Sequence, residues 1–190
     1  MTLALPAHLA DLDDSLVARA ARIRLACFDV DGTLTDGRLF LDADGRELKA
    51  FHVHDGQGLV LLRKAGIEVA FITARRSEVA ARRAEELGVR AHIGVKDKLG
   101  CVQALCKELG IGIDAVSFMG DDLPDLPVMR ACGLAVAPAD AHATTRTAAH
   151  WRTTARAGRG AARELCDLLL AAQGHFPVEM APTGITGDRA

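Results

Sequence analysis

Short apolar runs alternate along the chain with stretches that repeat apolar residues every three or four positions. The apolar runs have the length of buried strands and cover residues 25–30, 68–73, 89–93, 115–119 and 134–137. The repeating stretches predict helices at residues 13–22, 55–65, 77–87, 97–109, 125–131 and 161–172. This alternation predicts an α/β fold, a doubly wound, Rossmann-like parallel sheet with helices on both faces.

Residues 38–53 interrupt the alternation and predict a small β-hairpin. Two runs with strand character, residues 38–41 and 48–53, flank the turn sequence Asp-Ala-Asp-Gly of residues 42–45. The next helix is then expected to begin at residue 55 or 56.

The chain has 190 residues, 49% hydrophobic and 25% charged, which is enough for one good core and short for two domains. We expect a single domain over residues 1–173. Residues 174–190 carry prolines and glycines without periodicity and are expected to form a flexible tail.

Charge and cysteine usage narrow the function classes. The net charge is −2, from 23 basic and 25 acidic residues, and nucleic-acid binding needs a basic face, so no nucleic-acid partner is expected. The five cysteines show no Cys-x-x-Cys spacing, as is typical of buried thiols in a reducing compartment. No apolar run approaches the roughly 18 residues of a membrane span, and a signal-peptide pattern is lacking. We therefore expect a cytoplasmic protein without membrane association.

Candidate chemistry begins where the first apolar run ends, with Asp29 and Asp31 followed by Gly32. Side chains alternate along an extended chain, so the two carboxylates can point the same way. Carboxylate and carbonyl oxygens suit a hard cation such as Mg²⁺, which completes its shell with phosphate and water. An ordinary turn is the alternative interpretation, since Asp and Gly also form turns.

Three further polar positions follow strands or open a helix. Thr73 ends the second apolar run, Lys98 opens a helix, and Asp121 follows the fourth run. Open α/β sheets bind their ligands at the carboxyl ends of strands. A phosphoryl group bound there would meet Mg²⁺, a hydroxyl, an ammonium and helix N-terminal amides.

Together these four motifs resemble those of the haloacid dehalogenase-like hydrolases. The resemblance implies that Asp29 attacks phosphorus to form an aspartyl-phosphate, while Asp31 protonates the leaving oxygen and then deprotonates water. It also implies that Mg²⁺ is held by Asp29, by the backbone carbonyl of Asp31 and by Asp121. Thr73 and Lys98 are then expected to hold the phosphoryl oxygens.

Supporting roles around this site are expected for Gly32, Asp122 and Asp125. The two carboxylates are expected to orient Lys98 or metal-bound water rather than to bind Mg²⁺ directly. An ordinary helix N-cap is the alternative for Asp125.

Many members of this superfamily carry an inserted lid domain, and this chain has no room for one. The hairpin and one helix fill the first gap between motifs, and one helix and one strand fill the last. An open site binds a small substrate poorly, so a neighbouring subunit is the expected lid. The hairpin, with Phe40 and Leu41, could pair with a strand of that subunit, or it could instead fold onto its own domain.

Longer stretches resemble a lidless, tetrameric subfamily, the 3-deoxy-D-manno-octulosonate 8-phosphate phosphatases. They are residues 29–37, 51–56, 120–122, 133–141 and 158–164. The resemblance implies a homotetramer that hydrolyses this sugar-acid phosphate on the way to the inner sugar of Gram-negative lipopolysaccharide. The chain departs from many relatives at four positions: His52 replaces Asn, His54 and Val60 replace Arg, and Ala74 replaces Gly.

The same resemblance places the sugar-acid end of the substrate near residues 52–56. The residues implied to contact substrate are Asp31, His52, Val53, His54, Asp55, Gly56, Arg75, Arg83 and Lys98. Arg75 and then Arg83 are the candidates for bidentate binding of a phosphate or carboxylate. The alternative is that the histidines and arginines are simply exposed to solvent.

Other functions share parts of this pattern. A phosphatase of a nine-carbon 2-keto sugar acid 9-phosphate is the alternative among enzymes. A non-catalytic assembly module of this fold would be expected to have lost one of the four groups Asp29, Asp31, Lys98 or Asp121, and the chain keeps them all. A receiver domain lacks an acid two residues after its phosphorylated Asp, which argues against that class.

Overall fold

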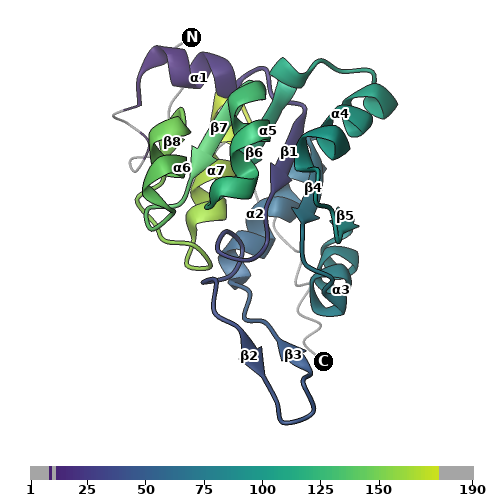
Figure 1. Ribbon diagram of the computed structural model, residues 1–190. Coiled ribbons are helices and arrows are strands. Elements are labelled where there is room, and N and C mark those ends of the chain that lie inside the picture. Colours follow the sequence, from purple (N-terminus) through teal and green to yellow (C-terminus); the bar gives the residue numbers. More distant parts are fainter. Residues whose placement is uncertain (1–8, 10–11, 176–190) are drawn as a thin grey trace, which may run out of the picture.

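The structure is a computed structural model that describes residue 9 and residues 12–175 (Figure 1). These residues contain a sheet of six parallel strands in the order β5-β4-β1-β6-β7-β8. The strands are β1 (Leu25–Phe28), β4 (Glu68–Thr73), β5 (Arg90–Ile93), β6 (Val116–Met119), β7 (Leu134–Ala137) and β8 (Trp151–Arg152). The predicted α/β fold with a doubly wound parallel sheet is confirmed.

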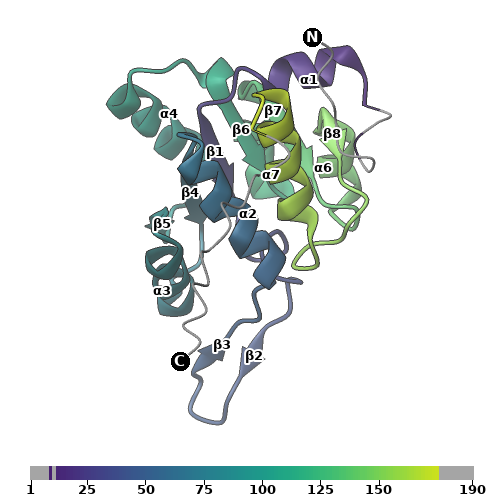
Figure 2. The same cartoon turned by 180° about the vertical axis from the view of Figure 1, so that it is seen from behind.

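Helices cover both faces of this sheet. Within the described residues they are α1 (Asp14–Ala20), α2 (Val53–Lys64), α3 (Glu78–Leu87), α4 (Lys98–Leu109), α5 (Leu126–Ala131), α6 (Ala143–Ala148) and α7 (Ala161–Ala172). In both views α2 and α7 lie side by side on one face, and α4 and α5 lie on the other (Figures 1 and 2).

The core consists of two apolar layers, one on each face of the sheet. Along β1, Ala26 and Phe28 pack with the layer of α2 and α7, while Leu25 and Cys27 pack with that of α4 and α5. A parallel sheet covered on both faces buries its central strands, which explains the nearly unbroken apolar runs of β1, β6 and β7 in the sequence. Each large apolar side chain buried in this way stabilises the fold by about 1.5–3 kcal/mol.

Local signals set several helix boundaries near the site. The side chains of Ser77 and Asp97 accept backbone N–H groups in the first turns of α3 and α4. Gly88 and Gly110 follow these helices in the left-handed conformation, which glycine adopts without strain. Asp97 thereby fixes the position of Lys98, the first residue of α4.

The hairpin is present but shorter than predicted. Strands β2 (Phe40–Leu41) and β3 (Glu47–Leu48) pair antiparallel, and α2 begins at Val53. The predictions that the second strand reaches residue 53 and that the helix begins at residue 55 or 56 are wrong. After β3 the chain turns back toward the body, where Phe51 packs against the core and His52 adopts the extended N-cap conformation.

Two short elements, α6 and β8, were absent from the sequence-based prediction. Strand β8 has two residues and pairs with β7, and α6 buries Thr145 as its one fully enclosed residue. Strand β8 spans a single period of strand alternation and α6 fewer than two helical turns, so neither gives a clear periodic signal in the sequence.

The hairpin projects from the body in both views (Figures 1 and 2). Its apolar residues are exposed, at 52% for Leu39, 47% for Phe40, 61% for Leu41 and 64% for Leu48. The exposed tip of the hairpin therefore does not pack against its own domain, whereas Glu47 and Lys49 at its base contact Ser77 and Asp31 of the body. Within the described residues, it is the sole insertion between β1 and α2, and no cap domain is present.

Two further predictions concern the ends and membrane spans. Only Gly174 and His175 of the expected flexible tail belong to the part of the chain that the structure describes, and residues 176–190 lie outside it. None of the helices in the described part has both the length and the apolar character needed to cross a membrane.

Candidate active site

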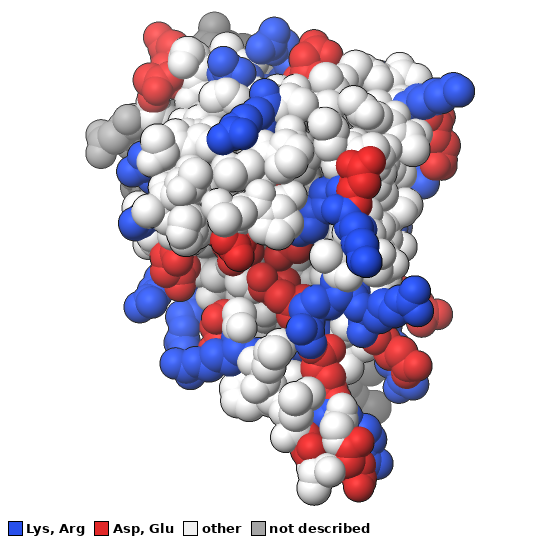
Figure 3. All heavy atoms as spheres, in the orientation of Figure 1, with Lys and Arg blue, Asp and Glu red and all other residues white. Residues whose placement is uncertain are grey.

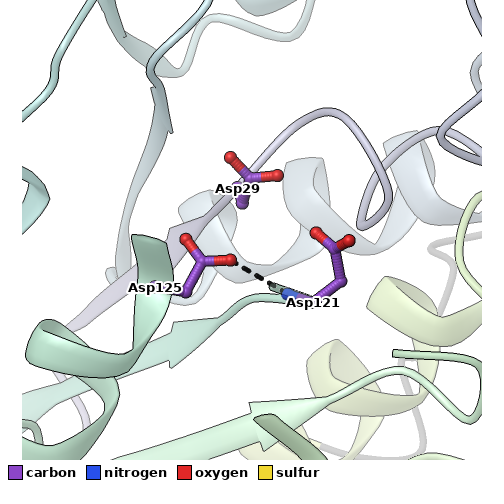
Figure 4. Close-up of side chains that lie close together, drawn as sticks. All are labelled: Asp29, Asp121 and Asp125. Carbon is purple, nitrogen blue, oxygen red and sulfur yellow. Dashed lines mark hydrogen bonds between the residues drawn. The ribbon is translucent and has the colours of Figure 1, made fainter. Parts of the chain in front are cut away.

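The carboxyl ends of β1, β4 and β6 meet at one edge of the sheet. The amide of Asp29 donates to the carbonyl of Met119 at 2.9 Å, which places the residue after β1 beside the end of β6. Asp121 follows β6, and the hydroxyl of Thr33 donates to its Oδ1 at 3.3 Å. Figure 4 shows Asp29, Asp121 and Asp125 with their carboxylates close together.

Gly32 lies where a side chain would collide with this cluster. Its φ is +95°, and a Cβ atom would lie 2.2 Å from Oδ2 of Asp121. Any other residue here would be strained and would push Asp121 aside. The glycine of the first Asp motif is therefore required for the two strand ends to approach one another.

Lys98 bridges two of the carboxylates. Its Nζ lies 2.5 Å from Oδ1 of Asp29 and 2.5 Å from Oδ1 of Asp125, and all three side chains are at least nine-tenths buried. Burial alone would lower the pKa of Lys98, but the charges of Asp29 and Asp125 outweigh burial and raise it. We call this ion pair of Lys98 with Asp29 and Asp125 the deep bridge.

Both oxygens of Asp125 have protein partners. Oδ1 accepts from Lys98, and Oδ2 accepts the backbone N–H groups of Asp121 at 3.0 Å and Asp122 at 3.2 Å. The side chain of Asp125 makes no cap bond to α5, so the simple N-cap interpretation is wrong. It is instead the N3 residue of a capping box, in which Asp122 is the N-cap of the short 3₁₀ helix Leu123–Asp125.

The donor set of this cluster fits a divalent cation. One oxygen from each of Asp29, Asp121 and Asp125 lies within 4.8 Å of the others. Burial raises the pKa of Asp29 to about 6, against the opposing effect of Lys98, and burial with the charges of Asp29 and Asp125 raises the pKa of Asp121 to about 8. Lys98 offsets the burial of Asp29 only in part, and Mg²⁺ would supply further positive charge through the oxygen ligands it prefers. Because Asp125 is fully engaged, Asp29 and Asp121 are the better candidate ligands.

Asp31 lies outside this cluster and faces the hairpin. Its Oδ1 accepts from the ammonium of Lys49, and its Oδ2 accepts from the hydroxyl of Thr73 at 3.5 Å. Arg75 approaches the same oxygen, with Nε at 3.8 Å. Thr73 is buried and also accepts the backbone N–H of Arg75 at 3.2 Å.

Lys49 and Glu47 were not predicted as site residues. Lys49 bonds to Asp31 and, at 3.1 Å, to Oε1 of Glu47, and we call this ion pair the hairpin bridge. Glu47 also accepts from Nη2 of Arg75 and the hydroxyl of Ser77, each at 2.7 Å. The signal in the sequence is the alternation of Glu47, Leu48 and Lys49, because residues two apart on a strand share a face.

The sugar-site candidates divide into two groups. His52 and Gly56 line a small pocket with Phe51 and Arg83. A Cβ atom on Gly56 would lie 2.3 Å from Nη2 of Arg83, so the glycine makes room for this guanidinium. Nδ1 of His52 is buried and has no hydrogen-bond partner among the described residues.

The other candidates have different surroundings. Val53 is 71% exposed, and the ring of His54 packs edge-on against that of His52 at 5.0 Å between centroids. The carboxylate of Asp55 is buried and accepts the N–H groups of Gly160 and Arg163 at the start of α7. Burial raises the pKa of Asp55 in spite of these bonds. Its side chain joins α2 to α7 rather than facing the catalytic carboxylates.

Acidic and basic side chains are distributed unevenly around the site. Figure 3 shows acidic side chains gathered in a hollow between the body and the hairpin, with basic side chains on both sides of it. Such an arrangement suits a bound cation at the centre and an anionic ligand above it.

Comparisons with known proteins agree with this geometry. Residues 93–165 match the family model of haloacid dehalogenase-like hydrolases. The chain is 45% identical over 161 residues to the 3-deoxy-D-manno-octulosonate 8-phosphate phosphatase of Yersinia pestis, which covers 84% of this chain and 86% of that protein.

Solved structures agree as well. A hypothetical protein of Xanthomonas campestris is 58% identical, with a TM-score of 0.89 over 91% of this chain and 95% of its own. The octulosonate 8-phosphate phosphatase of Moraxella catarrhalis, solved with magnesium, phosphate and the sugar acid KDO, is 40% identical, with a TM-score of 0.85 over 87% of this chain and 95% of its own.

Proposed function

The chain belongs to the 3-deoxy-D-manno-octulosonate 8-phosphate phosphatase family of haloacid dehalogenase-like hydrolases, and we propose that it is a Mg²⁺-dependent phosphatase acting on this sugar-acid phosphate. The products are the free sugar acid and inorganic phosphate, in lipopolysaccharide biosynthesis. The observation that carries this function is the meeting of Asp29, Lys98 and Asp121 at one sheet edge, in a chain 45% identical to a phosphatase of that name.

In the first half of the proposed reaction, a carboxylate oxygen of Asp29 attacks phosphorus. The bond between phosphorus and the sugar oxygen breaks, and Asp31 gives a proton to the departing oxygen. Lys98 and Thr73 hold the phosphoryl oxygens, and the ion pair with Lys98 keeps Asp29 in its attacking orientation. The result is a phosphoryl group bound covalently to Asp29.

In the second half, Asp31 takes a proton from a water molecule that attacks this phosphoryl group. Phosphate leaves and Asp29 is restored as a carboxylate. Asp29, Asp121 and the backbone carbonyl of Asp31 would hold Mg²⁺, which would supply positive charge beside the phosphoryl oxygens. Gly32, Asp122 and Asp125 support this site by the close approach, the capping box and the deep bridge described above.

The sugar-acid end is proposed to lie along the start of α2. His52 offers a buried nitrogen without a partner in the described chain, Arg83 offers a guanidinium group in the same small pocket, and Arg75 offers one beside Asp31. Because the carboxylate of Asp55 is engaged by α7, residues 53–56 would contact substrate mainly through backbone atoms and the His54 ring.

We also propose that the protein is a homotetramer in which neighbouring subunits close the site. The exposed apolar residues of the hairpin, Leu39, Phe40, Leu41 and Leu48, form the kind of surface that marks subunit contacts. A groove of about 710 Å³ runs between the hairpin and the start of α3 and leaves room for a neighbour.

Two further proposals concern organisation and location. Residues 1–173 form one phosphatase domain, because the two core layers share a single sheet. The protein is cytoplasmic, which fits its five free cysteines, four of them buried.

The deciding experiment is a screen of phosphate release from sugar-acid phosphates, each with and without Mg²⁺. The expected best substrate by kcat/KM is 3-deoxy-D-manno-octulosonate 8-phosphate. A higher kcat/KM for a nine-carbon 2-keto sugar acid 9-phosphate would assign the site to that substrate. Absence of turnover on every phosphate ester, by protein shown to be folded, would favour a non-catalytic assembly module.

A further inference from the structure

Lys49 combines a hairpin position with near-complete burial. Its side chain is 2% exposed, although neighbouring Leu48 is 64% exposed. An ammonium taken out of water is costly unless it is paired and hydrogen-bonded, and here both partners are carboxylates, Asp31 and Glu47. The hairpin therefore does more than present an apolar surface, because it carries a cation to the edge of the catalytic cluster.

Glu47 anchors this lysine to the body of the protein. One oxygen accepts from Lys49 and Arg75, and the other accepts from Ser77, the N-cap of α3. Burial would raise the pKa of Glu47, but the hydrogen bonds from Ser77, Arg75 and Lys49 outweigh it and hold the pKa at about 2. Glu47 is thus a permanent anion that shares the charge of Lys49 with Asp31.

The contacts on Asp31 restrict the rotation of its carboxylate. Lys49 holds Oδ1, while Thr73 and Arg75 lie on the side of Oδ2 at 3.5 and 3.8 Å. A carboxylate follows a broad, nearly two-fold torsional preference, so packing alone would leave its direction loosely defined. The contacts from Thr73 and Arg75 are at or beyond the limit of a hydrogen bond, which makes Lys49 the main constraint on this group.

We propose that Lys49, anchored by Glu47, is a positioning residue that aims the carboxyl group of Asp31 at the leaving-group oxygen. This inference rests on the proposed role of Asp31 as the proton donor and acceptor of the phosphatase. Misplacing a catalytic group by about 1 Å can cost up to about 100-fold in rate. The loss should fall on esters whose leaving group needs a proton and should spare esters whose leaving group departs without one.

A pair of phosphate esters tests this dependence on the leaving group. An alkyl phosphate needs a proton on its departing oxygen, whereas p-nitrophenyl phosphate releases a stable anion without one. Lys49→Met keeps the side-chain length and removes the ammonium. Lys107→Met, on the exposed last turn of α4, is the matched control. The measured quantity is the single-turnover rate of leaving-group release under saturating Mg²⁺.

For Lys49→Met we expect alkyl phosphate release to slow by about 10- to 100-fold, with KM changed by less than about threefold. Release of p-nitrophenolate should stay within about threefold of the wild-type rate, and Lys107→Met should match the wild type on both esters. Lys49→Arg keeps the charge and should show the same selectivity with a smaller loss. Equal losses on both esters, or no loss on either, would overturn the inference.

Two controls keep the outcome decisive. Circular dichroism and light scattering establish that each variant keeps its fold and assembly, and if Lys49→Met fails this check, Lys49→Arg is judged by the same criterion. Wild-type protein that hydrolyses both generic esters but not octulosonate 8-phosphate would refute the proposed substrate while the Lys49 comparison still stands. Wild-type protein that hydrolyses no ester would refute both.

Discussion

The deep bridge and the hairpin bridge each place one lysine between two carboxylates, but their surroundings differ. Lys98 is the first residue of α4, and its ammonium lies 6.0 Å from the centre of the Phe118 ring in the core. Lys49 comes from a projecting hairpin, and its partners Asp31 and Glu47 keep 16% and 15% of their side-chain surface exposed. The partners of Lys98 keep 8% and 2%.

This difference in burial indicates that the two bridges have separate roles in the reaction. The deep bridge is fixed by the sheet and its helices, so it suits phosphoryl transfer and cation binding, which need charges that do not move. The hairpin bridge depends on an element that the proposed subunit contacts would hold in place. Proton transfer at Asp31 is then the step that assembly can tune, and each experiment below tests one side of this comparison.

The largest loss of activity is expected from Asp29→Asn, which changes one carboxylate of the deep bridge. Loss of the nucleophile should lower kcat by more than about 10⁴-fold on every phosphate ester, because no ester avoids attack by this group. Steady-state phosphate release is the measurement, with Asp114→Asn at an exposed position as the control. Near-normal activity would remove the covalent mechanism.

The next effect is expected at the hairpin bridge, from Asp31→Asn. Removing a general acid and base should slow hydrolysis of a sugar phosphate by about 10²–10⁴-fold. In single turnovers, p-nitrophenolate release should be slowed much less. If both esters lose equally, Asp31 does not act as the proton donor, and the proposed separation of the two bridges fails.

Removal of Mg²⁺ should act on the deep bridge and lower kcat by at least about 100-fold. Ca²⁺ should inhibit rather than substitute, because it prefers a larger and looser oxygen shell. Activity is measured after chelation with EDTA and again after Mg²⁺ is restored. Full activity in the chelated protein contradicts the assignment of Asp29 and Asp121 as ligands.

The stability of the metal-free protein should depend on pH, because Asp29 and Asp121 are carboxyls with raised pKa values. The pKa values of Asp29 and Asp121, about 6 and about 8, are raised, so the folded protein binds these protons more tightly than the unfolded chain. Without metal, the free energy of unfolding should therefore fall as pH rises from about 4 to about 8, by on the order of a few kcal/mol. Urea unfolding at several pH values tests this, and Mg²⁺ should flatten the slope. A metal-free protein that gains stability over this range would contradict the pKa shifts.

The smallest loss of activity is expected from substitutions on the exposed apolar surface of the hairpin. Phe40→Ser with Leu41→Ser should weaken tetramer formation and lower kcat/KM by about 10-fold, since subunit contacts then no longer hold the hairpin bridge in place. Light scattering is recorded beside kinetics, with Ala104→Ser on the exposed side of α4 as the control. A monomer with undiminished kcat/KM would show that the site is complete within one chain.

Much of the fold follows from local pattern. Apolar runs predicted the buried strands β1, β4, β6 and β7, and the short strand predicted at residues 89–93 corresponds to β5. The helices predicted at residues 77–87 and 97–109 begin at their caps Ser77 and Asp97. The end of β3 and the start of α2 were misjudged, because Phe51 could serve equally in a strand or at the entry to a helix. Core packing decided between the two.

In the candidate site, too, the sequence predicted some features, and the packing of the elements decided the others. The sequence determined which groups gather at the strand ends, because Asp29, Thr73 and Asp121 each follow a strand whose carboxyl end is set by the parallel sheet. It did not reveal that Lys49 pairs with Asp31 or that Asp55 joins α2 to α7.

Those contacts were decided by tertiary structure alone. Asp55 and Arg163 are separated by 108 positions, and Lys49 and Asp31 by 18. Periodicity reports the face on which a side chain lies within its own element. Which partner it meets depends on how the elements pack, and burial then makes the pairing of these charges obligatory.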